Sequence, residues 1–172
     1  MSLLQLNATQ LSPSPRGHVT ASSDFLDNAS KRNGSDLLKG SPYVGAVGRV
    51  LIAALFLISG LAKIATPVLT LGFIASAGLP FPLLAYLVAI IIEVGGGILL
   101  ILGYQSRIVA SVMGVYTVAA ALSFHSNFAD QNAMAHFLKN ISITGGLLQI
   151  VAFGAGTFSI DSRLAKSRTS NG

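Results

Sequence analysis

Glu93 has the strongest case for a chemical role in this sequence, because it lies in the middle of a long apolar segment. In a helix over residues 83–103 it is the eleventh of 21 residues, which would place its carboxylate near the centre of a bilayer. A carboxylate at that depth costs several kcal/mol unless it is protonated or paired with a cation. We therefore predict either a neutral Glu93 or a cationic partner on a neighbouring segment.

The polar residues that could meet Glu93 gather at one end of the apolar segments. Lys63 lies near the end of the preceding segment, and its flexible stem can reach several ångströms along a helix. His125 ends the third apolar segment, and a polar stripe enters the fourth from the same side. We expect one polar pocket formed by Lys63, Glu93, His125, His136, Lys139 and Asn140. The face of the second segment that should point into the bundle carries Tyr86, Ala89, Glu93, Gly96, Gly97, Leu100 and Tyr104.

Two interpretations of this polar set stay open at the level of sequence. Lys63 and Glu93 could form a buried ion pair that fixes the register of two helices. Alternatively, they could bind a ligand or handle protons, as ionisable groups inside membranes often do. The two histidines and Asp130 lack the spacing of a metal site, so we expect neither a metal ion nor a haem. The glycines at 95–97 and 145–146 are more typical of close helix packing than of a cofactor loop.

The scarcity of charge places these residues in a membrane protein. Charged residues make up 10% of the chain and hydrophobic residues 52%, whereas a soluble domain carries about 25% charge. Residues 43–160 contain only six charges, namely Arg49, Lys63, Glu93, Arg107, Asp130 and Lys139. The net charge of +5 has no accompanying aromatic and basic patch, so we expect no nucleic-acid partner. The chain has no cysteine, which excludes disulfides and thiol chemistry.

Four apolar segments predict an all-α membrane protein, a bundle of four transmembrane helices at about 44–65, 83–103, 108–124 and 141–158. Between the first two, residues 66–82 are apolar but too short and too broken to span, so we predict an interfacial or re-entrant segment. Residues 1–42 are predicted to be a disordered tail, and whether they belong to the mature chain stays open. Residues 161–172 are predicted to be a basic tail.

The distribution of basic residues predicts the orientation. Four spans place both termini on one side, and that side holds most of the lysines and arginines. The positive-inside rule therefore predicts that both termini are cytoplasmic, with Arg49 and Arg107 as anchors at the cytoplasmic edge. Arg49, Arg107 and Arg163 recur at similar spacing, which suggests two repeated helical hairpins.

Short motifs along residues 43–163 resemble the DoxX family, and they cover about 70% of the chain. They are Gly48-Arg49, Ser59-Gly60-Leu61-Ala62-Lys63, Gly78-Leu79-Pro80-Phe81-Pro82, Glu93 followed by Gly95-Gly96 and Leu102-Gly103, and His136-Phe137-Leu138-Lys139-Asn140. The resemblance implies a small four-helix protein of the bacterial inner membrane. The family is named for similarity to a subunit of a thiosulfate:quinone oxidoreductase, and some relatives are associated with quinone resistance or oxidative stress. It supplies no agreed catalytic residues.

The sequence supports three hypotheses for function. The first is a redox-associated membrane subunit that binds a quinone, has no redox centre of its own and receives electrons from a partner oxidoreductase subunit. The second is a proton-coupled transporter of a small molecule, which would need a homo-oligomer because four helices are few for a pathway. The third is a membrane scaffold for a soluble enzyme. In each case the lipid bilayer is the first partner.

Overall fold

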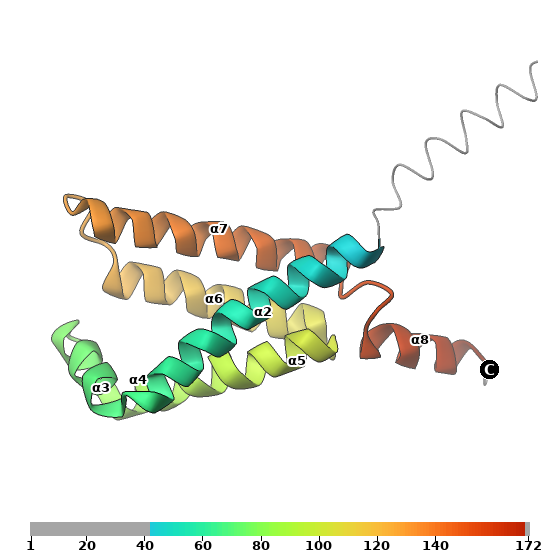
Figure 1. Cartoon of the computed structure of the whole chain (residues 1–172), viewed down its shortest axis with the longest axis horizontal. Helices are drawn as coiled ribbons and strands as arrows, with labels where there is room; N and C mark the ends of the chain where they lie inside the picture. Colours follow the sequence, from blue (N-terminus) through green and yellow to red (C-terminus); the bar gives the residue numbers. More distant parts are fainter. Residues whose placement is uncertain (1–41, 171–172) are drawn as a thin grey trace, which may run out of the picture. The chain divides into compact units, whose positions relative to one another are not determined.

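The computed structural model describes residues 42–170, which form a helical unit (Figure 1). Its elements are α2 (Pro42–Ala65), α3 (Pro67–Ser76), α4 (Pro82–Ile90), the π-helical turn η1 (Ile91–Gly95), α5 (Gly96–Leu102), α6 (Ser106–Phe124), α7 (Gln131–Phe153) and α8 (Ile160–Ser170). The elements α4, η1 and α5 follow one another without a break and make one long helix. No strand occurs in the described range, as an all-α protein requires. Apart from Pro42, the predicted N-terminal tail lies outside it.

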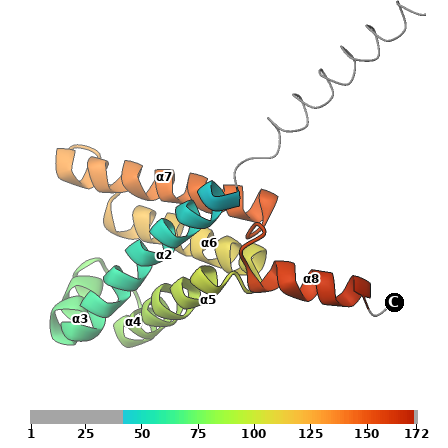
Figure 2. The ribbon, with the colours of Figure 1, turned by 45° about the vertical axis from the view of Figure 1, so that its right-hand side comes forward.

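The long helices run back and forth between two ends of the unit. Helices α6 and α7 lie side by side in both ribbon views, and α2 packs against η1 and α5 (Figures 1 and 2). We call one end the Arg49 end, where the start of α2 meets the α5–α6 turn and the segment after α7. We call the other the Lys139 end, where the loop between α6 and α7 lies.

Three helices are long and apolar enough to cross a membrane, over Tyr43–Ala65, Pro82–Leu102 and Ser106–Phe124. The chain is therefore a membrane-embedded protein, but the prediction of four spans is confirmed only for these three. Helix α7 has 23 residues and the necessary length. It is less apolar than the other three because its first half carries His136, Lys139 and Asn140.

The bounds of α7 differ from those predicted for the fourth segment, which were residues 141–158. The helix begins at Gln131, because the side chain of Asp130 accepts a hydrogen bond from the Asn132 backbone N–H at 2.8 Å and caps the first turn. It ends at Phe153, where Gly154 adopts a φ of 78° that a helix cannot continue. The apolar run marks only the part of a helix that suits lipid. Helix α7 therefore begins ten residues before the predicted run and ends five residues before the end of that run.

The segment between the first two spans contains a helix of ten residues, α3, that is too short to span. Pro67 and Pro82 each stand at the start of a helix, where a missing N–H costs nothing. Between α3 and α4 the chain turns through Gly78 and Phe81, which both have positive φ. An interfacial position for α3 stays a prediction.

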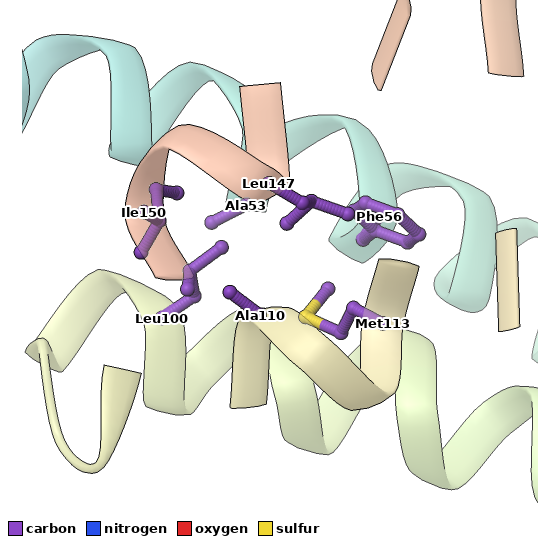
Figure 3. Packing of buried hydrophobic residues seen from close by; sticks show 7 residues of the cluster. All are labelled: Ala53, Phe56, Leu100, Ala110, Met113, Leu147 and Ile150. Atoms are coloured by element: carbon purple, nitrogen blue, oxygen red, sulfur yellow. The ribbon is translucent and has the colours of Figure 1, made fainter. Parts of the chain in front are cut away.

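The core joins four helices through closely packed side chains (Figure 3). It is formed by Ala53, Phe56, Leu100, Ala110, Met113, Leu147 and Ile150. Glycines allow the approach: a Cβ on Gly97 would lie 2.8 Å from Leu57, and one on Gly146 would lie 2.9 Å from Ile52. Close packing is thus confirmed for these positions and for Gly96, whereas Gly95 and Gly145 face open space.

Arg49 holds the Arg49 end together from inside. Its guanidinium is buried and donates hydrogen bonds to the carbonyl oxygens of Ala155 and Phe158, the latter at 2.7 Å, and approaches that of Ile101 at 3.5 Å. Arg107, in contrast, is exposed. The two predicted edge anchors therefore have different environments, and the repeated hairpins receive no support from them.

Helix α8 is docked through Asp161, so the predicted basic tail begins as an ordered helix. The carboxylate accepts hydrogen bonds from the backbone N–H groups of Gln105 at 2.7 Å and Ser106 at 2.9 Å, and it caps the start of α6. Partial burial alone would raise the pKa of Asp161, but these bonds and the nearby Arg49 charge outweigh it, so the pKa is lowered.

Candidate functional site

Glu93 lies at the centre of the π-helical turn η1 and is 4% exposed. A π-turn holds more residues than an α-helical turn, and such turns are frequent at functional sites. On either side of it, Ala89, Gly97 and Leu100 are also buried. The prediction that this face of the helix points into the bundle is confirmed for these four residues. Tyr104, at the far end, is exposed.

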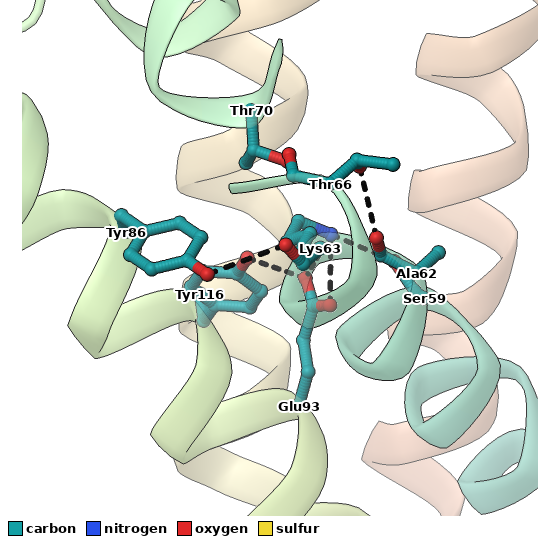
Figure 4. A network of polar contacts seen from close by, with 8 residues as sticks. All are labelled: Ser59, Ala62, Lys63, Thr66, Thr70, Tyr86, Glu93 and Tyr116. Atoms are coloured by element: carbon teal, nitrogen blue, oxygen red, sulfur yellow. Dashed lines mark hydrogen bonds and ion pairs between the residues drawn. The ribbon is translucent and has the colours of Figure 1, made fainter. Parts of the chain in front are cut away.

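Lys63 is the cationic partner of Glu93, which is one of the two outcomes predicted from the sequence. Its ammonium lies 2.9 Å and 2.8 Å from the two carboxylate oxygens, and it also donates to the Ser59 hydroxyl at 2.8 Å (Figure 4). The ammonium therefore commits all three of its hydrogens within the protein. This is the only ion pair among residues 42–170.

Tyr116 completes the network and was not predicted from the sequence. Its hydroxyl donates to Glu93 Oε1 at 2.6 Å (Figure 4). The signal in the sequence was a single tyrosine in the middle of the third apolar segment, which looks like an ordinary lipid-facing aromatic. A second tyrosine, Tyr86, donates to the Lys63 carbonyl oxygen at 3.3 Å and steadies the end of α2. We call Lys63, Glu93 and Tyr116 the polar triad.

A cavity of about 420 Å³ adjoins the polar triad. This is the size of a small-molecule site, which in general is lined by apolar groups with a few polar ones. Its apolar walls come from five helices and include Phe56, Phe73, Val88, Phe124 and Ile143. Besides the triad, its polar lining includes Ser59, Thr117, His125, Lys139 and Asn140. Five of the six predicted pocket residues thus line one cavity.

The sixth, His136, does not line the cavity but contacts two residues that do. Its imidazole stacks on that of His125 with ring centroids 5.0 Å apart and planes inclined by 22°. Its Nδ1 lies 3.1 Å from Lys139 Nζ. The predicted residues therefore fall into two groups. Lys63 and Glu93 belong to the polar triad deep in the helices, and His125, His136 and Lys139 form a basic cluster at the Lys139 end, next in sequence to Asn140.

The site offers little to a metal ion. Within the part of the chain that the structure describes, no three histidine, cysteine or acidic side chains gather closely enough to hold one. Stacked imidazoles also present their faces to each other, so they do not direct two nitrogens at one haem iron. The chemistry available is hydrogen bonding, proton transfer and binding of an apolar molecule.

Comparison with known proteins gives consistent matches. The DoxX family model matches residues 45–126. The inner membrane protein YqjF of Escherichia coli (strain K12) is 35% identical over 120 residues, which cover 70% of this chain and 91% of that protein. The inner membrane protein YphA of the same organism is 32% identical over 128 residues, covering 71% and 91%. No solved structure matches the chain.

Proposed function

The chain belongs to the DoxX family of inner membrane proteins, and from this premise we propose that it binds a quinone in the cavity beside Lys63, Glu93 and Tyr116. The observation that carries the proposal is the position of this polar triad on the wall of an otherwise apolar cavity. In the proposal the protein is a redox-associated membrane subunit, and a partner oxidoreductase supplies the electrons.

The cavity suits a flat, mostly apolar molecule with a polar edge. Phe56, Phe73 and Phe124 supply aromatic wall, and Val88 and Ile143 supply aliphatic wall. Burial of a ring among such groups is favourable by roughly 25 cal/mol per Å² of apolar surface. A bound quinone would supply electron-accepting chemistry, taking up two electrons and two protons when it is fully reduced.

The triad can deliver a proton to an oxygen in the cavity. In the described state Tyr116 donates to Glu93, which is a carboxylate paired with Lys63. When Glu93 takes up a proton, it can donate to the Tyr116 oxygen, and the tyrosine hydroxyl can turn to donate to a ligand. Tyr116 is therefore the proposed ligand contact, and Lys63, with its three hydrogens committed, positions Glu93.

The closed core favours binding over transport. Towards the Arg49 end, the cavity meets the packed layer that contains Leu100, Met113 and Leu147, all fully buried. A transported molecule would have to pass this layer, which would require the four helices to separate. A proton-coupled transporter is thus the weaker alternative, whereas the packing does not bear on a scaffold for a soluble enzyme.

We also propose that α7 is the fourth span and that the Arg49 end is cytoplasmic. The length of α7 matches the thickness of a bilayer, and α7 lies beside α6 (Figure 1). Arg107, Arg163, Lys166 and Arg168 lie at that end, as the positive-inside rule requires. Because the chain has no cysteine, single cysteines at Ser170 and Asn127 can be labelled cleanly with an impermeant maleimide in intact cells. Labelling at Asn127 alone is expected, and labelling at Ser170 would contradict the orientation.

Quinone binding is tested with purified protein in nanodiscs and decylubiquinone as the probe, by equilibrium dialysis. Wild-type protein should bind saturably. Tyr116→Phe should raise the Kd about tenfold, because it removes one buried hydrogen bond to the ligand. Tyr104→Phe is the matched control, because Tyr104 is exposed at the opposite end and should leave affinity unchanged. Absence of saturable binding, or equal affinity of both variants, would refute the proposal.

A further inference from the structure

His125 and Lys139 of the basic cluster line the same cavity, but the quinone contact proposed above is Tyr116 and uses none of the cluster. His125 ends α6, while His136 and Lys139 lie in the first turns of α7. The two imidazoles stack at 5.0 Å, and Lys139 Nζ lies 3.1 Å from His136 Nδ1. Tyr116 precedes His125 by about two and a half turns of α6, which separates the two levels by roughly 13 Å along the helix.

The hydrogen bond between Lys139 and His136 uses only one of the donors that the cluster contains. An ammonium can only donate, so His136 Nδ1 must accept from Lys139. The hydrogen of a neutral His136 is then on Nε2, which is free to donate to another group. Lys139 keeps two further hydrogens, and its side chain is exposed to solvent. The adjacent Asn140 carries an amide that can donate as well.

The charge of the cluster is not balanced by the chain that the structure describes. Residues 42–170 contain three acidic side chains: Glu93 is paired with Lys63, Asp161 caps α6 at the other end, and Asp130 caps α7. None of them forms an ion pair with His125, His136 or Lys139. Burial lowers the pKa of His125, and the neighbouring His136 and Lys139 lower it further. The Lys139 ammonium has no carboxylate partner among residues 42–170, and a bound anion would supply the missing counter-charge.

We infer that His125, His136 and Lys139 form an oxyanion site that binds a phosphate group at the mouth of the cavity. The phosphate could come from a lipid headgroup, since the cluster lies beside the end of a membrane-spanning helix, or from free inorganic phosphate. The chemistry is the same in both cases: charge-assisted hydrogen bonds from Lys139 and the imidazole N–H groups to phosphate oxygens. The site is independent of the quinone proposal and would stand if that failed.

The test follows the imidazole signals of full-length protein with labelled histidine by NMR, in dodecyl maltoside micelles, which carry no phosphate, titrated with inorganic phosphate against chloride of equal ionic strength. Phosphate should shift the His125 and His136 signals saturably and raise the pKa of His125, because the bound anion favours the imidazolium. Lys139→Gln should weaken phosphate affinity about tenfold, whereas Lys139→Arg should largely keep it. Lys166→Gln, at the opposite end, is the matched control and should behave as wild type.

A second arm identifies the source of the phosphate. Nanodiscs that contain phosphatidylglycerol and no inorganic phosphate should show the anion-bound His125 signal at once if a lipid headgroup occupies the site. If only inorganic phosphate produces it, the site takes a free anion, and the proposal still holds. The proposal is overturned if neither source gives a saturable shift, or if Lys139→Gln and Lys166→Gln respond alike.

Discussion

The ion pair between Lys63 and Glu93 makes an asymmetric prediction about stability. The Glu93 side chain is 5% exposed and that of Lys63 is 26% exposed. Removing Lys63 leaves a buried carboxylate with Tyr116 as its main donor, whereas removing the charge of Glu93 leaves a lysine that can extend towards water. Lys63→Met should therefore destabilise the protein more than Glu93→Gln.

The magnitudes follow from the exposure of each partner. Breaking a fully buried pair costs about 3–5 kcal/mol, and the partial exposure of Lys63 puts Lys63→Met near the lower end, about 3 kcal/mol. Glu93→Gln keeps a group that can bond Tyr116 and loses charge-assisted bonds only, for about 1–1.5 kcal/mol. The double variant contains no stranded charge, so its cost should fall short of the sum by about 2 kcal/mol.

The assay is reversible unfolding of the purified protein in mixed micelles titrated with dodecyl sulfate, followed by loss of helix content. Lys166→Met serves as the control, because Lys166 is exposed on α8, and it should shift the unfolding free energy by less than about 0.5 kcal/mol. The reasoning is refuted if Glu93→Gln costs as much as Lys63→Met, or if the two costs simply add.

Three further predictions concern packing and docking. Arg49→Lys keeps the charge but cannot donate to several carbonyl oxygens at once, so it should lower the unfolding free energy by about 2 kcal/mol in the same assay. A change below about 0.5 kcal/mol would show that these buried hydrogen bonds do not stabilise the protein. Gly60→Ala would place a Cβ 2.7 Å from Val94 and should cost about 1–3 kcal/mol, whereas Gly48→Ala in the same helix meets open space and should cost nothing; equal effects would contradict the close contact. The lowered pKa of Asp161 means that its contribution to docking α8 is fully present above its ordinary pKa of 3.8 and is lost as the pH falls through the lower folded value. Hydrogen exchange in α8 should thus rise only in that acid range, and Asp161→Asn should remove the dependence; exchange that rises equally in both would count against the cap.

The sequence predicted best the features that the bilayer constrains, which are the pairing of buried charges and the apolar length of a spanning helix. Burying a lone charge is so costly that Glu93 required a partner, and Lys63 was the cation within reach. The same constraint identified three spanning helices from apolar length alone. Polar residues near one end, such as His125 and Lys139, could be grouped because the topology brings the ends of α6 and α7 together.

Other features depend on contacts that no local pattern records. Tyr116 belongs to the triad because of the rotation of α6 about its axis, and a tyrosine in an apolar segment carries no sign of that rotation. Helix α8 looked like a tail because its sequence is short and charged, and its docking depends on the distant backbone of Ser106. The early start of α7 was visible in principle, since Asp130 is a capping residue type, but the segment after it is too polar to suggest a span.

The π-helical turn at Ile91–Gly95 makes the length of this helix a structural constraint. Deleting any one of its residues would restore ordinary α-helical spacing and rotate one half of the helix against the other by roughly 100°. Glu93 and Leu100 could then no longer face the bundle together, although each now does. The helix should therefore tolerate substitution at an exposed position such as Ile91 but no single-residue deletion, and alignments of related chains should keep gaps out of this stretch.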